Sequence, residues 1–480
     1  MSTSTMTSAT RGTWGSRLAF ILAVAGSAIG LGNIWRFPIV TAEGGGGAFV
    51  LIYLLCAAFV GLPVMLAEMV VGRAGERNPV GAIKHLGNGT KWRWVGGLGV
   101  VTAFIVLSFY SVIAGWTIHY MFSAGVGKFT ETLDTDAYFI EMVADPGKEM
   151  LYHGIFMIAV ILTVAAGIRN GIERTIKVTM PILGVVLLVL LIRSLTLPGA
   201  FEGLAYYLTP DFSKVTANTV LQALAQAFFS LSLGMGAIIT YGSYLQKDES
   251  LPSSAGYVVM LDSAVALLAG CIIFPALVYA NLPLDEGGPG LMFQVLPQVL
   301  VQLPWAPWGG ILFGTIFFLL LAIAAFTSAI SLLEVPVSYL VDEKNWKRKK
   351  ATWFVGGGAF LIGIPSALSL GAVGWLTELP GFEMSLIDLL SGPFMDGALV
   401  IGALGLSLFV GWKWGLQRAL TEIRQGSPDF KLSAIWAFSI RYVAPIAIVS
   451  ILTFQLYSIF TPDSSPEESP EEAVIESTDL

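Results

Sequence analysis

Long apolar stretches recur along this 480-residue chain, and short polar segments separate them. Each stretch has about the length of a helix that crosses a bilayer. We expect eleven transmembrane helices, at approximately 15–40, 47–72, 94–123, 152–168, 176–194, 218–243, 257–281, 309–341, 352–367, 385–412 and 437–461. The pattern therefore predicts an all-α integral membrane protein.

Glycines interrupt two of these spans. The first span holds three glycines between Gly26 and Asn33, and the sixth holds Gly234 and Gly236. Glycines favour unwinding, which is tolerated at membrane depth only inside protein or beside a polar cavity, although glycines also allow close helix packing. Because the two spans lie five apart, they indicate an inverted repeat with a site between the broken helices. We expect two five-helix inverted repeats with helices 1 and 6 discontinuous, at about 15–194 and 218–412, followed by helix 11 at about 437–461.

Composition and charge agree with a membrane protein and orient it. Hydrophobic residues make up 55% and charged residues 12%, about half the charged share that is usual in soluble domains. Lysines and arginines gather in every second loop, beginning with the segment 1–14, which the positive-inside rule places in the cytoplasm. Eleven spans then put the C-terminus outside the inner (plasma) membrane. We expect a membrane domain at 15–461 and a disordered, acidic, extracytoplasmic tail at 462–480.

Two of the carboxylates inside the predicted spans bear on the site. Glu68 lies about one turn from the end of the second span, where it is either an interfacial charge or an acceptor for backbone N–H groups that unwinding frees elsewhere. Asp262, in the seventh span, has no basic residue nearby in the sequence, and a lone buried carboxylate is costly. A bound cation is therefore the natural partner of Asp262.

Hydroxyl groups mark two further spans. Ala324, Thr327 and Ser328 share one face of the eighth span through their i, i+3, i+4 spacing, which offers one carbonyl and two hydroxyls. Such hydroxyls also bond back to their own helix, and that alternative stays open. Tyr110, near the middle of the third span, is either a ligand contact or a packed ring with a satisfied hydroxyl. Oxygen atoms gathered near broken helices would suit a small hard cation.

Three separate segments resemble signature sequences of the neurotransmitter:sodium symporter family. They are Gly30-Leu31-Gly32-Asn33-Ile34-Trp35-Arg36-Phe37-Pro38, Ser230-Leu231-Ser232-Leu233-Gly234-Met235-Gly236 and Ala324-Ala325-Phe326-Thr327-Ser328. The segments occur in the family's order, and the resemblance runs from about Arg11 to Phe460. It is nearest to the eleven-span bacterial amino-acid transporters, so it implies a transporter domain with sodium sites, a substrate site and two gates.

The resemblance assigns each of these sites to residues of this chain. The first sodium site would comprise Ala28, Asn33, Ser230 and Asp262. The second sodium site would comprise Gly26, Ile29, Ala324, Thr327 and Ser328. The substrate would contact Ala28, Gly30, Leu31, Gly32, Val106, Tyr110, Phe229, Ser230, Ser232, Met235, Ser328 and Leu332. The outer gate would be Arg36 and Asp388, and the inner gate would be Arg11, Trp14, Tyr244 and Asp342.

The chain departs from the family pattern at Ser27, Gly44, Ser230 and Asp262, and only Asp262 changes the charge. Two sodium ions and one substrate carboxylate leave a net charge of +1 in a region of low dielectric, which a carboxylate at 262 would balance. Chloride-dependent members of the family hold the anion with an Asn at this position and a Ser one turn on, where this chain has Ala266. The resemblance therefore implies transport without chloride.

The sequence favours a sodium-coupled symporter that imports hydrophobic or aromatic L-amino acids by alternating access. The open alternatives are a sodium-dependent amino-acid sensor on the same fold and a symporter of another small amino-acid-like solute. A channel fits less well because two gates are expected, and no nucleophile and base or metal-ligand constellation indicates an enzyme. We expect sodium ions, the amino acid and the lipid bilayer as partners, with no nucleic acid and no obligatory protein partner.

Overall fold

The computed structural model describes residues 12–89, 91–130, 132–282, 291–302, 308–382 and 384–460. The predicted gate residue Arg11 and the acidic tail 462–480 lie outside these ranges, as does most of the segment 1–14. Within the described ranges the chain forms helices, with one isolated bridge between Gly46 and Pro210 and no strand. The prediction of an all-α fold is confirmed.

The helices alternate with short turns along the whole chain. Those of the first half are α1 (Arg17–Ala28), α2 (Phe37–Glu43), α3 (Gly47–Cys56), α4 (Leu62–Gly75), α5 (Pro79–Leu86), α6 (Arg93–Gly125), α7 (Thr135–Ala144), α8 (Pro146–Ala165), α9 (Arg174–Leu195) and α10 (Ala200–Leu208). Those of the second half are α11 (Ala217–Ser230), α12 (Ala237–Gly242), α13 (Leu251–Tyr279), α14 (Leu296–Gln302), α15 (Trp308–Lys344), α16 (Arg348–Ala367), α17 (Gly374–Thr377), α18 (Leu386–Ser391), α19 (Leu399–Leu408), α20 (Leu416–Gly426), α21 (Ser433–Phe438) and α22 (Ala444–Phe460). Short π or 3₁₀ turns lie between some of them, at η2 (Gly32–Arg36), η3 (Ala57–Gly61), η4 (Ile168–Glu173), η5 (Phe212–Lys214), η6 (Leu291–Val295), η7 (Gly392–Ala398), η8 (Phe409–Gly415) and η9 (Ser439–Val443).

Most of the predicted spans appear as long apolar helices. In the described part of the chain, eight helices are long and apolar enough to cross a membrane, and one bent pair forms a further span. The remaining predicted spans, 218–243 and 352–367, correspond to α11 with α12 and to α16. These two are a pair of short helices and a helix that begins with three basic residues, so the count of eleven and the division into two repeats remain predictions.

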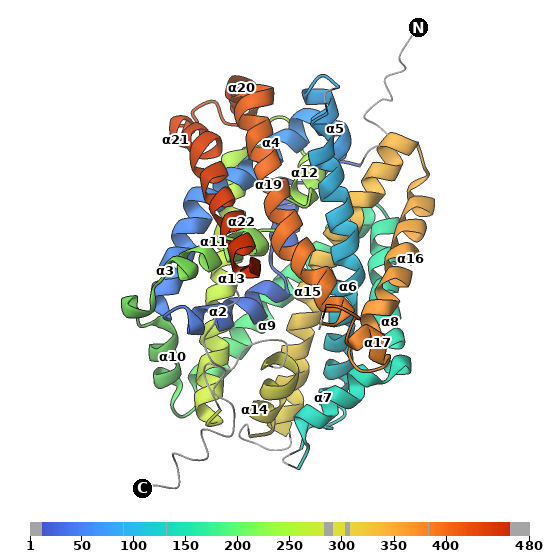
Figure 1. Ribbon diagram of the computed structural model, residues 1–480, viewed down its shortest axis with the longest axis vertical. Coiled ribbons are helices and arrows are strands. Elements are labelled where there is room, and N and C mark those ends of the chain that lie inside the picture. Colours follow the sequence, from blue (N-terminus) through green and yellow to red (C-terminus); the bar gives the residue numbers. More distant parts are fainter. Residues whose placement is uncertain are drawn as a thin grey trace.

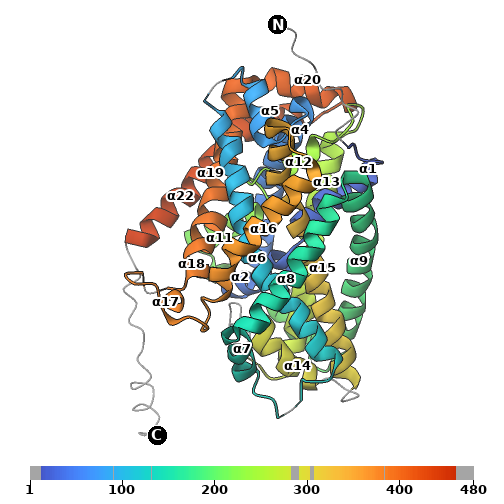
Figure 2. The ribbon, with the colours of Figure 1, turned by 90° about the vertical axis from the view of Figure 1, so that its right-hand side faces the viewer.

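The long helices run side by side along the longest axis of the molecule (Figure 1, Figure 2). Helices α5 and α20 lie at one end of this axis, and α7 and α14 lie at the other. Helix α15 passes through the interior, where Leu320, Ala324 and Ala325 are fully buried, and it packs along α6. A helix that is apolar on all sides is typical of the centre of a bundle. Together α6 and α15 form a continuous wall beside the two broken spans.

The first span breaks where its glycines lie. Helix α1 begins after Ser16, whose hydroxyl accepts the N–H of Ala19 at 3.2 Å, and it ends at Ala28. Ile29 then takes an extended conformation with φ −68° and ψ 104°, and the chain resumes its helical course at an angle of 56°. Such a break releases carbonyl and amide groups of both helix ends at the middle of the span. The predicted discontinuity of helix 1 is therefore present.

The second break separates α11 from α12. Ser232, Gly234 and Gly236 have φ values of +53°, +85° and +77°, a region that glycine enters without steric cost. A Cβ atom at Gly234 would lie 1.9 Å from the carbonyl oxygen of Leu399 in α19, so no larger residue fits there. The fully buried Glu68 of α4 accepts the Gly234 N–H at 2.6 Å. Glu68 is thus an acceptor for backbone freed by unwinding and not an interfacial charge.

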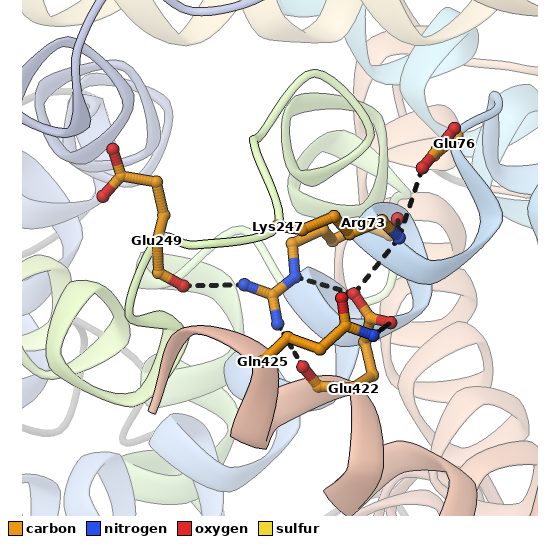
Figure 3. Close-up of polar contacts among 6 residues, drawn as sticks. All are labelled: Arg73, Glu76, Lys247, Glu249, Glu422 and Gln425. Carbon is orange, nitrogen blue, oxygen red and sulfur yellow. Dashed lines mark hydrogen bonds and ion pairs between the residues drawn. The ribbon is translucent and has the colours of Figure 1, made fainter. Parts of the chain in front are cut away.

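A polar cluster closes the end of the molecule that carries α5 and α20 (Figure 3). The buried Arg73 of α4 places its Nε 2.8 Å from the Glu422 carboxylate of α20 and donates to the Glu249 carbonyl at 2.7 Å. Lys247 donates to the Arg73 carbonyl at 2.8 Å and lies 3.2 Å from Glu76. Breaking a buried ion pair leaves one charge uncompensated, which is strongly unfavourable. The cluster therefore fixes α4, α20 and the loop after α12 relative to one another.

Candidate functional site

A cavity lies at the two helix breaks, and residues of α6 and α15 complete its walls. Its lining comprises Ser27, Ala28, Gly30, Leu31, Gly32, Asn33, Val106, Tyr110, Phe229, Ser230, Ser232, Met235, Ser328, Ser331 and Leu332. Every residue that the sequence predicts to contact substrate is in this set. Ser27 and Ser331 are additions that the sequence analysis did not assign to any site, although Ser27 is a departure from the family pattern. The signal for Ser331 was its position three residues after Ser328, which places both on one helix face.

Backbone at the first break forms one end of the cavity. The N–H of Leu31 points to the Tyr110 hydroxyl oxygen at 3.5 Å, and both residues line the cavity. A Cβ atom at Gly30 would lie 2.9 Å from Ser328 Oγ and 3.2 Å from the Tyr110 hydroxyl oxygen, so a side chain there would crowd these groups. Amide groups at the start of a helix carry partial positive charge. This end of the cavity can therefore receive an anionic group.

Polar side chains gather around Asp262 beside the same break. Asn33 Nδ2 donates to Asp262 Oδ1 at 2.8 Å and to Ser230 Oγ at 2.9 Å. The Ser230 hydroxyl donates to Asp262 Oδ2 at 2.7 Å. All three residues are at most 1% exposed. The structure thus brings together three of the residues predicted for the first sodium site, and Ala28, the fourth, lines the adjoining cavity.

Tyr53 also belongs to this polar group, although the sequence pattern did not identify it. Its hydroxyl lies 3.2 Å from Asp262 Oδ2 and 3.4 Å from Ser230 Oγ. The Phe37 ring packs edge-on against the Tyr53 ring, with centroids 4.7 Å apart, and holds the phenol in place. Nothing in the second span distinguishes Tyr53 from other buried aromatic residues, so only the folded chain reveals its contact with Asp262.

The residues predicted for the second sodium site meet between α1 and α15. Ser328 Oγ lies 3.5 Å from the Gly26 carbonyl oxygen and 3.3 Å from that of Ile29. Thr327 Oγ1 donates back to its own helix at the Ala324 carbonyl, at 3.1 Å, which is the alternative that the sequence left open. A Cβ atom at Gly26 would lie 3.3 Å from Thr327 Cβ, so the two helices touch here. The convergence of carbonyl and hydroxyl oxygens suits a small hard cation.

The structure does not bring the predicted outer gate residues together. The Arg36 guanidinium carbon lies 5.4 Å from the centre of the Phe229 ring, which lines the cavity. Asp388 accepts the Ser385 hydroxyl at 2.6 Å where these residues cap the start of α18. Among the contacts of the described residues, no ion pair joins Asp388 to Arg36. Arg36 over Phe229 is therefore the part of the predicted outer gate that the structure contains.

Two of the predicted inner gate residues, Trp14 and Tyr244, pack together on the side of the N-terminus. Trp14 is 3% exposed, its backbone N–H donates to the Tyr244 carbonyl at 3.2 Å, and the two rings meet edge-on with centroids 6.4 Å apart. Asp342 accepts the backbone N–H of Asn78 at 2.8 Å. Trp14 and Tyr244 thus form an aromatic plug, whereas the position of Arg11 is outside the described residues.

An ion pair behind this plug was not predicted. The Tyr244 hydroxyl donates to Glu334 Oε1 at 2.7 Å, and the Glu334 carboxylate is fully buried in α15. Arg348, at the start of α16, donates to both carboxylate oxygens of Glu334. Bidentate pairing of this kind is strong and directional. The plug is therefore anchored to α15 and α16 through a carboxylate inside a predicted span, Glu334, whose partner Arg348 the sequence does not identify.

Two broken helices that flank a central cavity are typical of secondary transporters. The model of the Sodium:neurotransmitter symporter family matches residues 11–151 and 139–466. The chain belongs to this family. It is a membrane protein and a sodium-dependent transporter, not an enzyme.

Relatives of this chain are similar to it over nearly the whole of its length. An uncharacterized sodium-dependent transporter of Bacillus subtilis, YhdH, is 38% identical and covers 91% of this chain and 96% of its own. The sodium-dependent serotonin transporter of Drosophila melanogaster is 27% identical over 94% of this chain and 77% of its own. The crystal structure of MhsT in complex with L-phenylalanine superimposes with a TM-score of 0.84 at 44% identity and covers 92% of this chain and 99% of MhsT. The similarity to MhsT confirms the predicted fold class.

Proposed function

We propose that this transporter is a symporter that imports hydrophobic and aromatic L-amino acids with sodium across the inner (plasma) membrane by alternating access. The observation that carries the proposal is a cavity in which Asn33 and Ser230, both hydrogen-bonded to Asp262, adjoin the apolar side chains of Val106, Met235 and Leu332. The L-phenylalanine bound to MhsT supports a ligand of this size and class. The orientation proposed has the N-terminus in the cytoplasm and the C-terminus outside.

The cavity fits the two ends of an α-amino acid. The substrate carboxylate would meet the backbone of Leu31 and Gly32 and the Tyr110 hydroxyl, and the amine would meet carbonyls at the two breaks. Because Gly30 has no side chain, the ligand itself must bring a carboxylate to the first sodium ion. The side chain of the substrate would then lie against the apolar part of the lining, which includes Val106, Met235 and Leu332.

Two sodium ions would be carried with each substrate molecule, one at each predicted site. In this structure Asn33 turns its amide nitrogen toward Asp262, at 2.8 Å, whereas a cation requires the amide oxygen. A half turn of the amide exchanges the two atoms. Binding of the first sodium ion would therefore replace the hydrogen bonds from Asn33 to Asp262 and Ser230. Because Asn33 lines the cavity, sodium binding would change the lining that the substrate meets.

Alternating access requires the two sides of the cavity to open in turn. Toward the cytoplasm, Trp14 would have to leave Tyr244, and toward the outside Phe229 would have to move from under Arg36. Because the substrate carboxylate would contact the first sodium ion, each ligand would raise the affinity of the protein for the other. That reciprocity would couple the inward movement of the amino acid to the sodium gradient. The negative charge of Asp262 would take the place of a chloride ion, so transport would need no chloride.

Decarboxylated amines should bind far more weakly than the parent amino acids. Phenethylamine lacks the carboxylate that would contact the first sodium ion and the backbone at Leu31, and each hydrogen bond to a charged group contributes about 1.5–3 kcal/mol. We expect at least a tenfold weaker inhibition of labelled phenylalanine binding by phenethylamine than by phenylalanine. Equal inhibition would show that the carboxylate is not recognised.

Met235→Phe should narrow the range of substrates. Met235 is buried at the second break between two glycines, and an unbranched side chain adapts to ligands of different size. We expect the ratio of tryptophan uptake to leucine uptake to fall by at least about tenfold. Met235→Leu, which nearly conserves volume, is the matched control and should change the ratio little. A loss that is equal for both substrates would argue against an adaptable Met235.

Equilibrium binding tests the proposal as a whole. The purified protein should bind labelled leucine, phenylalanine and tryptophan in sodium chloride and lose this binding when choline replaces sodium, because the cation completes the carboxylate site. Glutamate should compete poorly, since its second carboxylate would lie against apolar lining. Binding that is unaffected by sodium, or that is confined to polar amino acids, would contradict the proposal.

A further inference from the structure

Five serines line the cavity, and the hydroxyl proton of each is already donated within the protein. Ser27 Oγ donates to Ser331 Oγ at 2.7 Å, and Ser331 Oγ donates to the Ser328 carbonyl at 2.7 Å. The Ser232 hydroxyl donates to the Ser27 carbonyl at 2.9 Å. Ser27, Ser331 and Ser232 are 2%, 1% and 7% exposed, so bulk water does not compete for them.

The oxygens of Ser27 and Ser331 nevertheless keep acceptor capacity. A hydroxyl group has one proton and two acceptor lone pairs. Among the hydrogen bonds of the described residues, Ser27 Oγ accepts none and Ser331 Oγ accepts only that of Ser27. This pair of side chains can therefore receive a hydrogen bond from a molecule in the cavity but has no proton left to give.

We propose that Ser27 and Ser331 form an acceptor pair that selects substrates whose side chain carries a hydrogen-bond donor on an aromatic ring, namely the indole N–H of tryptophan and the phenol O–H of tyrosine. The inference rests on the proposed function of the cavity as an amino-acid site. A buried N–H or O–H without an acceptor loses its hydrogen bonds to water, whereas a purely apolar ring has none to lose. The acceptor pair thus offsets the loss of hydrogen bonds to water that burial imposes on the indole N–H of tryptophan or the phenol O–H of tyrosine.

A matched pair of ligands isolates this effect. In 3-benzothienylalanine a sulfur atom replaces the indole N–H of tryptophan and leaves the size nearly unchanged. We expect wild-type protein to take up tryptophan about tenfold more efficiently than this analogue, since one hydrogen bond contributes up to about 1.5 kcal/mol. The double variant Ser27→Ala/Ser331→Ala should bring the ratio of the two uptake efficiencies to about one.

Ser338→Ala is the control variant. Ser338 lies in the same helix, is 2% exposed and donates back to the Val335 carbonyl at 2.8 Å, but it does not line the cavity. It should leave the ratio of the two uptake efficiencies as in wild type. The single variant Ser331→Ala should lower the ratio in part and serves if the double variant does not fold.

The possible results separate this inference from the proposed function. A ratio of about one in wild type, or a ratio that neither serine variant changes, overturns the acceptor pair while sodium-dependent amino-acid uptake still stands. If wild-type protein takes up no amino acid with sodium, the proposed function itself is wrong. A ratio that falls in both serine variants and not in Ser338→Ala supports the acceptor pair.

Discussion

Asp262→Asn should make sodium-driven uptake weak or dependent on chloride. Asp262 is fully buried, contacts Asn33, Ser230 and Tyr53, and would balance the charge left by two sodium ions and one substrate carboxylate. Removing one member of a buried charge arrangement costs about 3–5 kcal/mol. We therefore expect sodium affinity to fall on the order of 100-fold, because the substituted site holds an uncompensated positive charge.

Uptake measured in sodium chloride and in sodium gluconate tests this expectation. Wild-type uptake should be the same in both buffers, while Asp262→Asn should lose most uptake in gluconate. Adding Ala266→Ser to Asp262→Asn supplies a hydroxyl donor one turn away and should restore uptake in chloride in part. Asp145→Asn is a suitable control, since Asp145 caps α8, where asparagine caps equally well, and its other contact is a partly exposed ion pair with Lys148 at 3.5 Å. Wild-type uptake that collapses without chloride would refute the charge argument.

Glu68→Ala should lower both stability and transport. Glu68 accepts the N–H of Gly234 at 2.6 Å inside the protein, and its removal leaves that amide without its acceptor. An orphaned buried donor costs about 1–3 kcal/mol, and the deleted side chain adds a cavity beside the break. We expect a lower midpoint of thermal unfolding and at least tenfold weaker sodium-dependent binding, because the backbone of the second break contributes to the cavity.

Glu68→Gln provides the matched control for this prediction. The glutamine side chain is as long as that of glutamate and keeps a carbonyl oxygen at its end, which can accept the Gly234 N–H. It should keep most of the stability and binding that Glu68→Ala loses. Equal losses in the two variants would show that the negative charge of Glu68, and not its acceptor oxygen, supports the break.

Local signals explain which features could be predicted from the sequence. Glycines clustered at the middle of an apolar span indicated both discontinuities, at Gly30 and Gly234, although glycines alone do not break a helix, since Gly115 lies inside the continuous α6. The lining of the cavity followed from segments that resemble a known family, because those segments are contiguous in the chain. The capping of α18 by Ser385 was also readable from its spacing to Asp388, and it would have argued against Asp388 as the partner of Arg36.

Contacts between distant residues explain what could not be predicted. Arg73 and Glu422 are 349 positions apart, and neither differs in its neighbours from an ordinary residue at the end of a span. Tyr53 likewise reaches Asp262 across 209 positions. Whether a buried polar group meets a partner depends on helix packing, which the apolar pattern of the spans leaves undetermined. These groups therefore became visible only in the folded chain.

Concentrative uptake into proteoliposomes tests the central claim most directly. Labelled phenylalanine is placed at equal concentration inside and outside, and an inward sodium gradient is the only driving force. A sodium-coupled symporter predicts accumulation of phenylalanine inside, which disappears when an ionophore dissipates the gradient. If phenylalanine stays at equal concentration on both sides while the sodium gradient persists, the protein does not couple the two movements, and the account is contradicted.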